Sequence, residues 1–532
     1  MFLTVLRAIA LILALTGITR ADEAPLLMLP VAVLQDNADV VAAHAAAGTD
    51  LNALDPYGSR PLTIAATFGS MNALQALIQG GADLEARDAQ GSTALHIAAF
   101  FGRTRMVETL LSAGADPLAR NGDGSTALDI VLAPFASDVP IYDTLAKALG
   151  PLGLTLDYGA IAAARPGIAA LLRPDPEVLA KVDFTPPPDT PFPVVKAEKA
   201  LLDRAALAEL YYEAGHLENI YGLLVLRGGA AVAERYFNGN GPDQLSTRHS
   251  ITKSVLSALY GIALEQGCAP SLDANLIDYF PEIADQIGDP RKKTITMRQA
   301  LQMRSGFPME TTNPPLHDAL FFSEDWDWIP HFADFPLATD PGTTFAYSNL
   351  TSQLIAIALQ RACSTDLKSF GQDNLFSPIG GTVASWSADP QGYSMGWGEL
   401  TITARDMARF GQLYLNFGFH DGKTVVPPEW VSASSLDSYS EDAWTTPRLG
   451  RHIGGVGYGY QWWSGQAGNT AFVFAWGHGG QIIALIPRHA LVIVATADPQ
   501  FGLDPAKGEG WDKEQAILNL VGKYIATLGV RP

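Results

Sequence analysis

The sequence predicts two folded units of different class: an all-α repeat array, followed by an α/β domain built on an antiparallel sheet with flanking helices and a helical subdomain. Three observations support this prediction. A 33-residue period runs through the first part, a proline-rich stretch lies at 184–195, and strand-like apolar segments stand near both ends of the remainder. With 532 residues, the chain is also too long for one ordinary domain.

The composition is that of a folded, acidic protein. Hydrophobic residues make up 48% of the chain and charged residues 17%, which excludes a disordered chain. A formal net charge of −20 argues against nucleic acid or an anionic membrane surface as the main partner, since both attract basic patches. No His/Cys cluster has metal-ligand spacing and no phosphate-binding glycine loop stands out, so we expect neither a metal nor a cofactor.

Residues 1–21 have the pattern of a secretory signal peptide. A short basic start is followed by the apolar run 8–19 and by small residues at Thr19 and Ala21. The run is shorter than the roughly 20 residues that span a bilayer, although an N-terminal anchor is the alternative. We therefore expect a periplasmic or secreted bacterial protein whose mature form has no membrane span.

That compartment permits disulfides, and the chain has two cysteines. Cys268 and Cys363 each end a predicted helix. The sequence leaves two possibilities open, a bridge between them or two separate buried thiols.

The repeats come first in the chain. Asp55-Pro-Tyr-Gly58, Asp88-Ala-Gln-Gly91 and Asn121-Gly-Asp-Gly124 recur every 33 residues. With Ser92-Thr-Ala-Leu-His-Ile-Ala-Ala99, they make residues 22–150 resemble ankyrin repeats. The resemblance implies turns followed by helix pairs, which must stack because one unit cannot bury its own apolar face. It also implies a surface for a protein partner, and a His96 that orders a turn.

Residues 151–195 are predicted to be a linker. Residues 184–195, Phe-Thr-Pro-Pro-Pro-Asp-Thr-Pro-Phe-Pro-Val-Val, cannot continue a helix or a central strand. We expect this proline-rich part to be extended and semi-rigid.

The α/β domain is predicted over residues 196–532. A helical segment, 197–214, precedes strands at 221–226 and 230–236, which a Gly-Gly turn joins into a hairpin. Near the other end come strands at 471–476, 481–486 and 490–495 and a helix at 512–528, and segments from both ends should complete one sheet. Arg405 and Asp406 are expected to form a structural ion pair on a helix.

The most informative motif is Ser250-Ile-Thr-Lys253, which opens an apolar, helix-periodic run. Residues three apart share a helix face, so the Ser250 hydroxyl and the Lys253 amine can meet. A hydroxyl beside a desolvated lysine that can accept its proton is an activated nucleophile.

Two further elements complete a site. Tyr347-Ser-Asn349 supplies a phenol, whose pKa a neighbouring ammonium ion can lower, and an amide suited to holding a substrate or the lysine. His478-Gly479-Gly480-Gln481 is expected on an edge-like strand, where the glycines let a substrate lie against the backbone.

These motifs, in this order, resemble the class C β-lactamase-like serine hydrolases and penicillin-binding proteins, and most of all their 6-aminohexanoate-dimer hydrolase and esterase branch. Supporting stretches are 301–306, 341–349, 400–411 and 458–462. The resemblance implies that Ser250 attacks a carbonyl to form an acyl-enzyme, that Lys253 and Tyr347 share the acid/base work, and that the N–H groups of Ser250 and Gln481 form the oxyanion hole. Which of Lys253 and Tyr347 is the base stays open.

His478 departs from the family pattern, because β-lactamases carry Lys-Thr-Gly at this place. A histidine mostly neutral at pH 7 favours amide or ester substrates over β-lactams, and a purely structural turn histidine is the other interpretation. The leading hypothesis is a secreted amidase or esterase that needs no cofactor. The alternatives are a β-lactamase or D,D-peptidase and, from another class, an ankyrin-mediated binding protein with a degenerate hydrolase domain.

Overall fold

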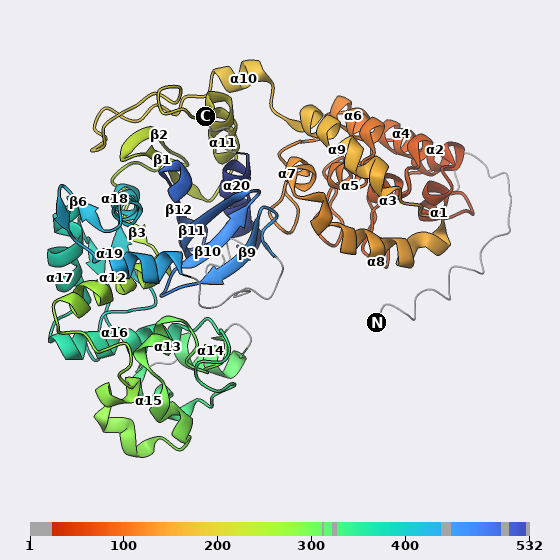
Figure 1. Ribbon diagram of the computed structural model, residues 1–532. Coiled ribbons are helices and arrows are strands. Elements are labelled where there is room, and N and C mark those ends of the chain that lie inside the picture. Colours follow the sequence, from red (N-terminus) through yellow and green to blue (C-terminus); the bar gives the residue numbers. More distant parts are fainter. Residues whose placement is uncertain (1–23, 311–312, 322–326, 438–447, 502–509, 528–532) are drawn as a thin grey trace. The chain divides into compact units, whose positions relative to one another are not determined.

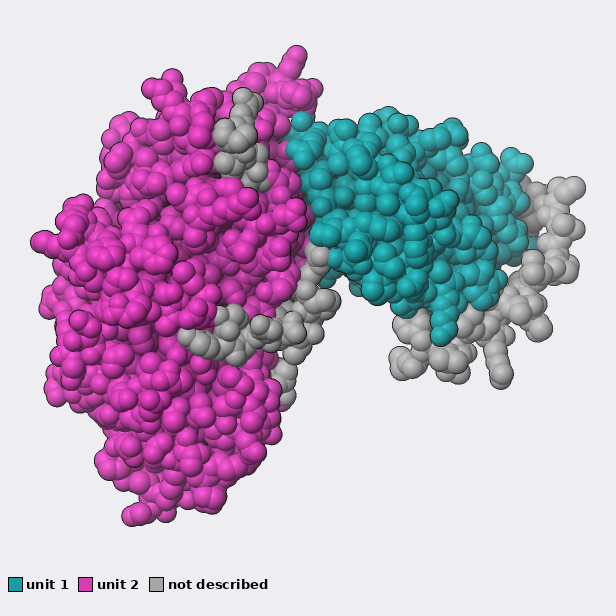
Figure 2. All heavy atoms as spheres, in the orientation of Figure 1, with its two compact units in different colours: residues 1–174 teal, residues 175–532 magenta. Residues whose placement is uncertain are grey.

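The computed structural model describes residues 24–310, 313–321, 327–437, 448–501 and 510–527. It divides the chain into two compact units, residues 1–174 and residues 175–532, which Figure 2 colours separately. Figure 1 shows that the first unit is helical and that the second combines a sheet with helices. Among the described residues, no helix is both long and apolar enough to cross a membrane.

The first unit is a two-layer stack of short helices. Helices α1, α3, α5, α7 and α9 pack in one row, while α2, α4 and α6 pack in another that α9 also contacts. Their apolar faces share one core. The elements are α1 Leu29–Leu34, α2 Ala38–Ala46, α3 Pro61–Phe68, α4 Met71–Gln79, α5 Ala94–Phe100, α6 Thr104–Ser112, α7 Ala127–Leu132, η2 Phe135–Ser137, α8 Val139–Leu149, η3 Gly150–Leu152 and α9 Tyr158–Leu172.

The 33-residue period corresponds to one repeated turn. The Asp55 carboxylate accepts the backbone N–H groups of Tyr57 and Ser59 at 2.8 and 2.7 Å. Asp88 and Asn121 make the same pair of bonds in the next two repeats. Each repeat is then joined to its neighbour through the turn backbone, as in the 2.8 Å bond from Ala89 N to Gly58 O.

His96 orders a turn, as the sequence predicts. It is buried, its Nδ1 lies 2.9 Å from the Thr93 hydroxyl, and its Nε2 donates to the Ser125 carbonyl at 3.0 Å. Burial lowers its pKa to about 4, so the ring is neutral at physiological pH.

The structure divides residues 151–195 differently from the predicted linker. Residues 158–172 form helix α9, whose Ile168 and Leu172 lie in the repeat core, and the boundary falls between Pro174 and Asp175. The internal proline of α9, Pro166, disfavours a helix prediction from the sequence.

The second unit is built on an eight-stranded antiparallel sheet with the order β2-β1-β13-β12-β11-β10-β9-β8. Strands from both ends of the domain complete this one sheet, because β1 pairs with β13, as predicted. The strands are β1 Ile220–Arg227, β2 Ala230–Tyr236, β8 Arg448–Leu449, β9 Ile453–Tyr458, β10 Trp463–Ala467, β11 Thr470–Gly477, β12 Gln481–Ile486 and β13 Leu491–Ala497; two small sheets hold β3 Ser246–Thr247, β4 Ser385–Trp386, β5 Leu400–Ile402, β6 Phe419–His420 and β7 Lys423–Thr424.

Helices cover both faces of this sheet (Figure 1). Leu223 and Val225 point into a core shared with α11 and α20, whereas Leu224 and Leu226 point into a core shared with α12 and α18. The helices are α10 Pro176–Ala180, α11 Arg204–Ala214, α12 Ile251–Glu265, α13 Met297–Leu301, α14 Pro314–Phe321, α15 Ile329–Asp334, α16 Asn349–Cys363, α17 Leu367–Gly371, α18 Ala404–Leu415, α19 Pro428–Val431 and α20 Trp511–Ala526; single-turn segments are η4 Leu276–Tyr279, η5 Pro281–Gln286, η6 Pro290–Thr294, η8 Gln372–Phe376, η9 Ser377–Ile379, η10 Ser432–Leu436 and η11 Pro487–His489.

The proline-rich segment 184–195 lies against the edge strand β2 rather than linking the two units freely. Its backbone exchanges hydrogen bonds with Ala231, which donates to Pro193 O at 2.7 Å and accepts from Val195 N at 3.0 Å. Prolines cannot donate, but their carbonyls accept from an edge strand, so such a segment suits this position.

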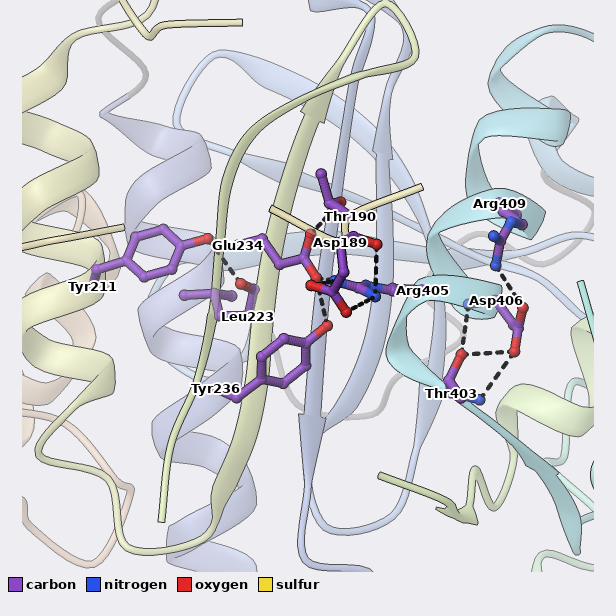
Figure 3. A network of polar contacts seen from close by, with 10 residues as sticks. All are labelled: Asp189, Thr190, Tyr211, Leu223, Glu234, Tyr236, Thr403, Arg405, Asp406 and Arg409. Carbon is purple, nitrogen blue, oxygen red and sulfur yellow. Dashed lines mark hydrogen bonds and ion pairs between the residues drawn. The ribbon is translucent and has the colours of Figure 1, made fainter. Parts of the chain in front are cut away.

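A buried ion pair fixes the same segment, and Figure 3 shows it. The Arg405 guanidinium lies 2.7 Å from the fully buried Glu234 carboxylate and also binds Asp189 of the proline-rich segment. Thr190 donates to the other Glu234 oxygen at 2.6 Å. The predicted Arg405–Asp406 pair is therefore wrong: Asp406 pairs with Arg409, because neighbouring helix residues point in different directions.

Two helices carry the predicted catalytic motifs, and they run side by side in the same direction. Ser250 and Lys253 lie at the start of α12, and Tyr347 and Asn349 lie at the start of α16. At their far ends, Cys268 and Cys363 form a disulfide, which resolves the alternative that the sequence leaves open.

We predict that this disulfide contributes about 4 kcal/mol to the stability of the second unit, because it closes a loop of 95 residues in the unfolded chain. Urea unfolding should show a lower midpoint when a reductant is present. A variant with both cysteines replaced by serine should unfold at that lower midpoint with or without reductant. Equal midpoints for the oxidised and reduced wild type would contradict the prediction.

Candidate active site

Ser250 stands where a short strand turns into a buried helix. The chain leaves β3 at Thr247, His249 adopts a left-handed conformation with φ 45°, and α12 begins at Ile251. Residues 251–263 are all buried, so the helix position is determined by its packing. Ser250 itself is only partly buried, and its N–H makes no hydrogen bond to the part of the chain that the structure describes. The nucleophile candidate is thus accessible beside a free backbone donor.

The Lys253 amine connects three segments of the fold. Its Nζ lies 2.9 Å from Ser250 Oγ, 2.7 Å from Asn349 Oδ1 and 2.8 Å from the carbonyl oxygen of Trp397. The last two atoms can only accept hydrogen bonds. The predicted Ser–Lys contact is therefore present, and Asn349 holds the lysine.

Lys253 is 1% exposed, and burial lowers its pKa to about 7. The charge of Glu310 opposes that effect without reversing it. A lysine with a pKa in this range exchanges protons readily at neutral pH, which an exposed lysine does not.

Tyr347 lies against the same amine, with Lys253 Nζ 4.9 Å from the centre of its ring. The phenol stacks on Trp463 at 5.4 Å and interacts with Ser250. Burial raises the pKa of Tyr347; the contact with Ser250 opposes this, and the charges of Glu310 and Glu514 add to the rise. The sequence expectation of a lowered pKa is wrong, because desolvation and two carboxylates outweigh the contact with Ser250.

Glu310 is a buried carboxylate that sequence reasoning missed. It is 3% exposed and accepts the Ser348 hydroxyl at 3.0 Å, Asn349 N at 2.9 Å and Leu350 N at 3.1 Å. It therefore caps the N-terminus of α16, directly beside the Tyr347–Asn349 motif. Its position four residues after Gly306, in an irregular stretch, has no periodic signal that could have revealed it.

Residues 478–480 form the turn between β11 and β12 rather than part of an edge strand, which corrects the prediction. β11 is paired on both sides along most of its length, but its last pair with β10 is Phe474 with Trp463. Beyond Phe474, β11 keeps only β12 as a neighbour, so this end of the strand is locally an edge. It also lies close to the nucleophile, because a Cβ on Gly477 would meet the Arg248 carbonyl at 2.3 Å.

His478 is held by the protein on both sides of its ring. Nε2 donates to the Phe501 carbonyl at 2.8 Å, and Nδ1 lies 3.2 Å from the buried Glu514 carboxylate of α20. Burial alone would lower the pKa of His478, but the hydrogen bond and charge of Glu514 outweigh it and raise the pKa. His478 is therefore more often protonated than the sequence suggests, and Glu514 balances its charge.

The remaining residues of the turn have structural surroundings. Glu514 also accepts Gly479 N at 2.9 Å and the Trp476 indole N–H at 2.6 Å. Gly479 and Gly480 have φ of 83° and 96°, and a Cβ on either would meet Asp498 O or Ile517 within 2.7 Å. The close packing and the left-handed backbone account for both glycines.

Gln481 is fully buried, and its side chain turns away from solvent. Its Oε1 accepts from Arg248 Nη1 at 3.1 Å, and its Nε2 donates to Ala497 O at 2.7 Å. Arg248, fully buried as well, ties this residue to the segment that ends in Ser250. The side chain of Gln481 is therefore engaged within the protein, and its predicted role rests on the backbone N–H.

The structure thus brings Ser250, Lys253, Tyr347 and Asn349 into one cluster, and places the ring of His478 5.5 Å from that of His249 beside it. Burial lowers the pKa of His249 to about 4, so it adds no charge at neutral pH. Within the described ranges, no group of three acidic, histidine or cysteine side chains could hold a metal ion. The arrangement supplies a hydroxyl, an amine and a phenol in mutual reach, which is the equipment for acyl transfer.

Comparisons with known proteins agree with this chemistry. The family model described as Beta-lactamase matches residues 211–512, and the model described as Ankyrin repeats (3 copies) matches residues 29–121. The 6-aminohexanoate-dimer hydrolase of Paenarthrobacter ureafaciens is 27% identical over 284 residues, which are 51% of this chain and 70% of that protein. Beta-lactamase-like protein 2 of Dictyostelium discoideum is 28% identical over 230 residues, 37% of this chain and 41% of that protein.

The chain also resembles solved structures at low identity. The octameric penicillin-binding protein homologue from Pyrococcus abyssi is 17% identical, covers 60% of this chain and 79% of its own, and superposes with a TM-score of 0.44. The family match extends over more than half of the chain and includes Ser250, Lys253, Tyr347, Asn349 and the 478–481 turn. The chain belongs to the beta-lactamase family, as a serine hydrolase of the amidase and esterase kind preceded by ankyrin repeats.

Proposed function

We propose that the protein cleaves an amide or ester bond through an acyl-enzyme on Ser250, with Lys253 as the general base and Tyr347 as the general acid. The observation that carries the proposal is the set of three contacts around Lys253 Nζ. These contacts support Lys253, rather than Tyr347, as the group that takes the proton of Ser250.

The hydrogen-bond inventory of the amine favours Lys253 as the base. Asn349 Oδ1 and the Trp397 carbonyl accept only, so each takes one amine hydrogen. In the neutral amine, the lone pair then faces the third neighbour, Ser250 Oγ, 2.9 Å away. Lys253 can therefore accept the hydroxyl proton as Ser250 attacks the carbonyl carbon.

Tyr347 suits the acid role because its pKa is raised and the phenol keeps its proton. When the tetrahedral intermediate collapses, the phenol donates that proton to the departing amine or alcohol. The Lys253 ammonium then gives a proton back to the phenol. In the second half of the reaction, a water molecule gives a proton to the Lys253–Tyr347 pair and attacks the acyl carbon. Ser250 Oγ leaves with a proton, which restores the starting state.

The free N–H of Ser250 is one donor for the oxyanion, and the Gln481 N–H is the predicted second one. Two donors aimed at a developing oxyanion contribute roughly 3 kcal/mol each in acyl transfer. The positive end of α12 adds to that field.

The surroundings of His478 argue against a role for this residue in binding a substrate carboxylate. A carboxylate-binding residue needs a free donor, whereas both ring nitrogens of His478 face protein oxygens. Glu514 also cancels its charge. The relative from Paenarthrobacter ureafaciens, named for a 6-aminohexanoate dimer, supports a linear amide or ester as the substrate class over a β-lactam or a D-alanyl peptide.

We predict that a fluorophosphonate labels the wild type and does not label Ser250→Ala, and that hydrolysis of a nitrophenyl ester falls about 10³-fold or more in that variant. Ser254→Ala is the matched control, since this buried serine lies on the same helix and donates to Gln461 O. It should label like the wild type. Equal labelling of Ser250→Ala would refute the assignment, and faster turnover of a cephalosporin than of esters and linear amides would favour the β-lactamase alternative.

The pH dependence of kcat/KM tests the choice of base. Because Lys253 acts as a base only when neutral, kcat/KM should rise about tenfold per pH unit at low pH and level off near pH 7. Tyr347 acts when protonated, so no loss from this group is expected below its ordinary pKa of 10.0. A rate that instead falls as the pH rises through 7 would assign the roles the other way.

We further propose that the protein is exported and that its ankyrin repeats bind a protein partner. The disulfide supports an oxidising compartment, and stacked repeats commonly present a protein-binding face. Purification of the expressed full chain through a C-terminal tag tests both. The mature N-terminus should lie at Asp22, and a specific partner should be lost when residues 24–174 are deleted. An unprocessed cytoplasmic chain would contradict export, and an unchanged set of bound proteins would contradict a partner on the repeats.

A further inference from the structure

Glu310 stands out because it is ionisable, buried and absent from the proposed chemistry. Its carboxylate accepts three hydrogen bonds from the start of α16. Only 3% of the residue is exposed, so a substrate does not reach it. In the described part of the chain, it forms no ion pair. A buried carboxylate in this situation needs a counter-charge nearby.

That counter-charge is Lys253, and Asn349 joins the two. The Asn349 side chain accepts from the lysine at 2.7 Å, while its backbone N–H donates to Glu310 at 2.9 Å. The two charges thus sit on opposite sides of one residue. Each influences the other electrostatically: Lys253 lowers the pKa of Glu310, although burial raises it on balance, and Glu310 works against the loss of the lysine charge.

Glu310 also determines where the motif lies. The first N–H groups of a helix lack partners within it, and this carboxylate takes those of Asn349 and Leu350. It accepts the hydroxyl of Ser348 as well, whose Oγ in turn accepts Thr351 N at 3.1 Å. The segment that carries Tyr347 and Asn349 is therefore held from one point.

We propose that Glu310 is a positioning residue for catalysis, which fixes the Tyr347–Asn349 segment and is the buried counter-charge of the Lys253 ammonium that forms during acylation. This inference rests on the proposed roles of Ser250 and Lys253. Glu310 touches neither the substrate nor the reacting atoms. It acts through Asn349 and through its charge.

Among the residues that the structure describes, few other ionisable groups face this pair. Around Lys253 lie Ser250 on its own helix, the ring of Tyr347, and Glu310; His249 also feels its charge but is neutral. Around Glu310 lie Tyr347 and Lys253. Loss of the Glu310 charge should therefore be felt mainly by the base and the acid of the proposed reaction.

Replacement of Glu310 by glutamine tests the charge. With the carboxylate gone, Lys253 should lose its proton at lower pH, so the low-pH rise of kcat/KM should shift down by about one pH unit. Since the ammonium formed in acylation is then less stabilised, kcat should fall about tenfold or more while KM changes little. Glu310→Asp keeps the charge and is the matched control, whose low-pH rise should stay at the wild-type position.

An unshifted rise in Glu310→Gln, with kcat lowered equally in both variants, would overturn the proposal and leave Glu310 as a purely structural cap. If kcat/KM of the wild type itself shows no rise toward pH 7, the assignment of Lys253 as the base is wrong. That result would refute the proposed function and not the role of Glu310 alone. The two results are therefore distinguishable.

A stability cycle tests the counter-charge independently of activity and remains informative when Glu310→Gln folds poorly. At a pH where Lys253 is protonated in the wild type and in Glu310→Gln, each of Glu310→Gln and Lys253→Met leaves one buried charge uncompensated, so each should lower the melting temperature. The double variant removes both charges and should melt above the less stable single variant. Losses that simply add would overturn the pairing.

Discussion

The second unit depends on one constraint, the burial of the Lys253 amine. A buried amine without partners would be strongly unfavourable, so every atom around it has to be in place. The acceptors come from α12, from the start of α16 and from the segment that leads into β5. A displacement of any of these segments would cost the amine one of its three partners, and so the lysine holds the three segments at a common point.

The two helices that meet at this point are joined again at the other end. α12 and α16 start at the site, run side by side and finish at the Cys268–Cys363 disulfide. Two parallel helices place two positive dipole ends at the same location. That arrangement favours a developing oxyanion and stabilises a carboxylate such as Glu310, whereas it disfavours a lysine that is permanently charged. The geometry of the helix pair and the chemistry of the site are thus linked.

Much of this could be predicted from the sequence because it depends on local pattern. The 33-residue repeat, the strands at both ends of the sheet and the Ser-x-x-Lys spacing all reflect periodicity, and the ankyrin and beta-lactamase classes are confirmed. The other features depend on contacts between residues far apart in the chain. Glu310 reaches Asn349, Glu514 reaches His478, and Arg405 reaches Asp189, and a local pattern does not show which distant residue each of these side chains meets. The errors on Tyr347 and His478 come from the folded environment of each side chain: burial raises the pKa of Tyr347, and Glu514, distant in sequence, raises the pKa of His478 against the effect of burial.

The proposed division of labour between base and acid follows from one physical effect. Desolvation disfavours the charged form of any group, so it pushes an amine toward its neutral, basic form and a phenol toward its neutral, acidic form. Lys253 and Tyr347 share one buried environment and are shifted in these opposite directions. Glu310 and Glu514 add negative charge near the phenol, which makes the phenolate still less favourable. In such a pair, burial moves each partner toward the protonation state that the proposed acylation requires.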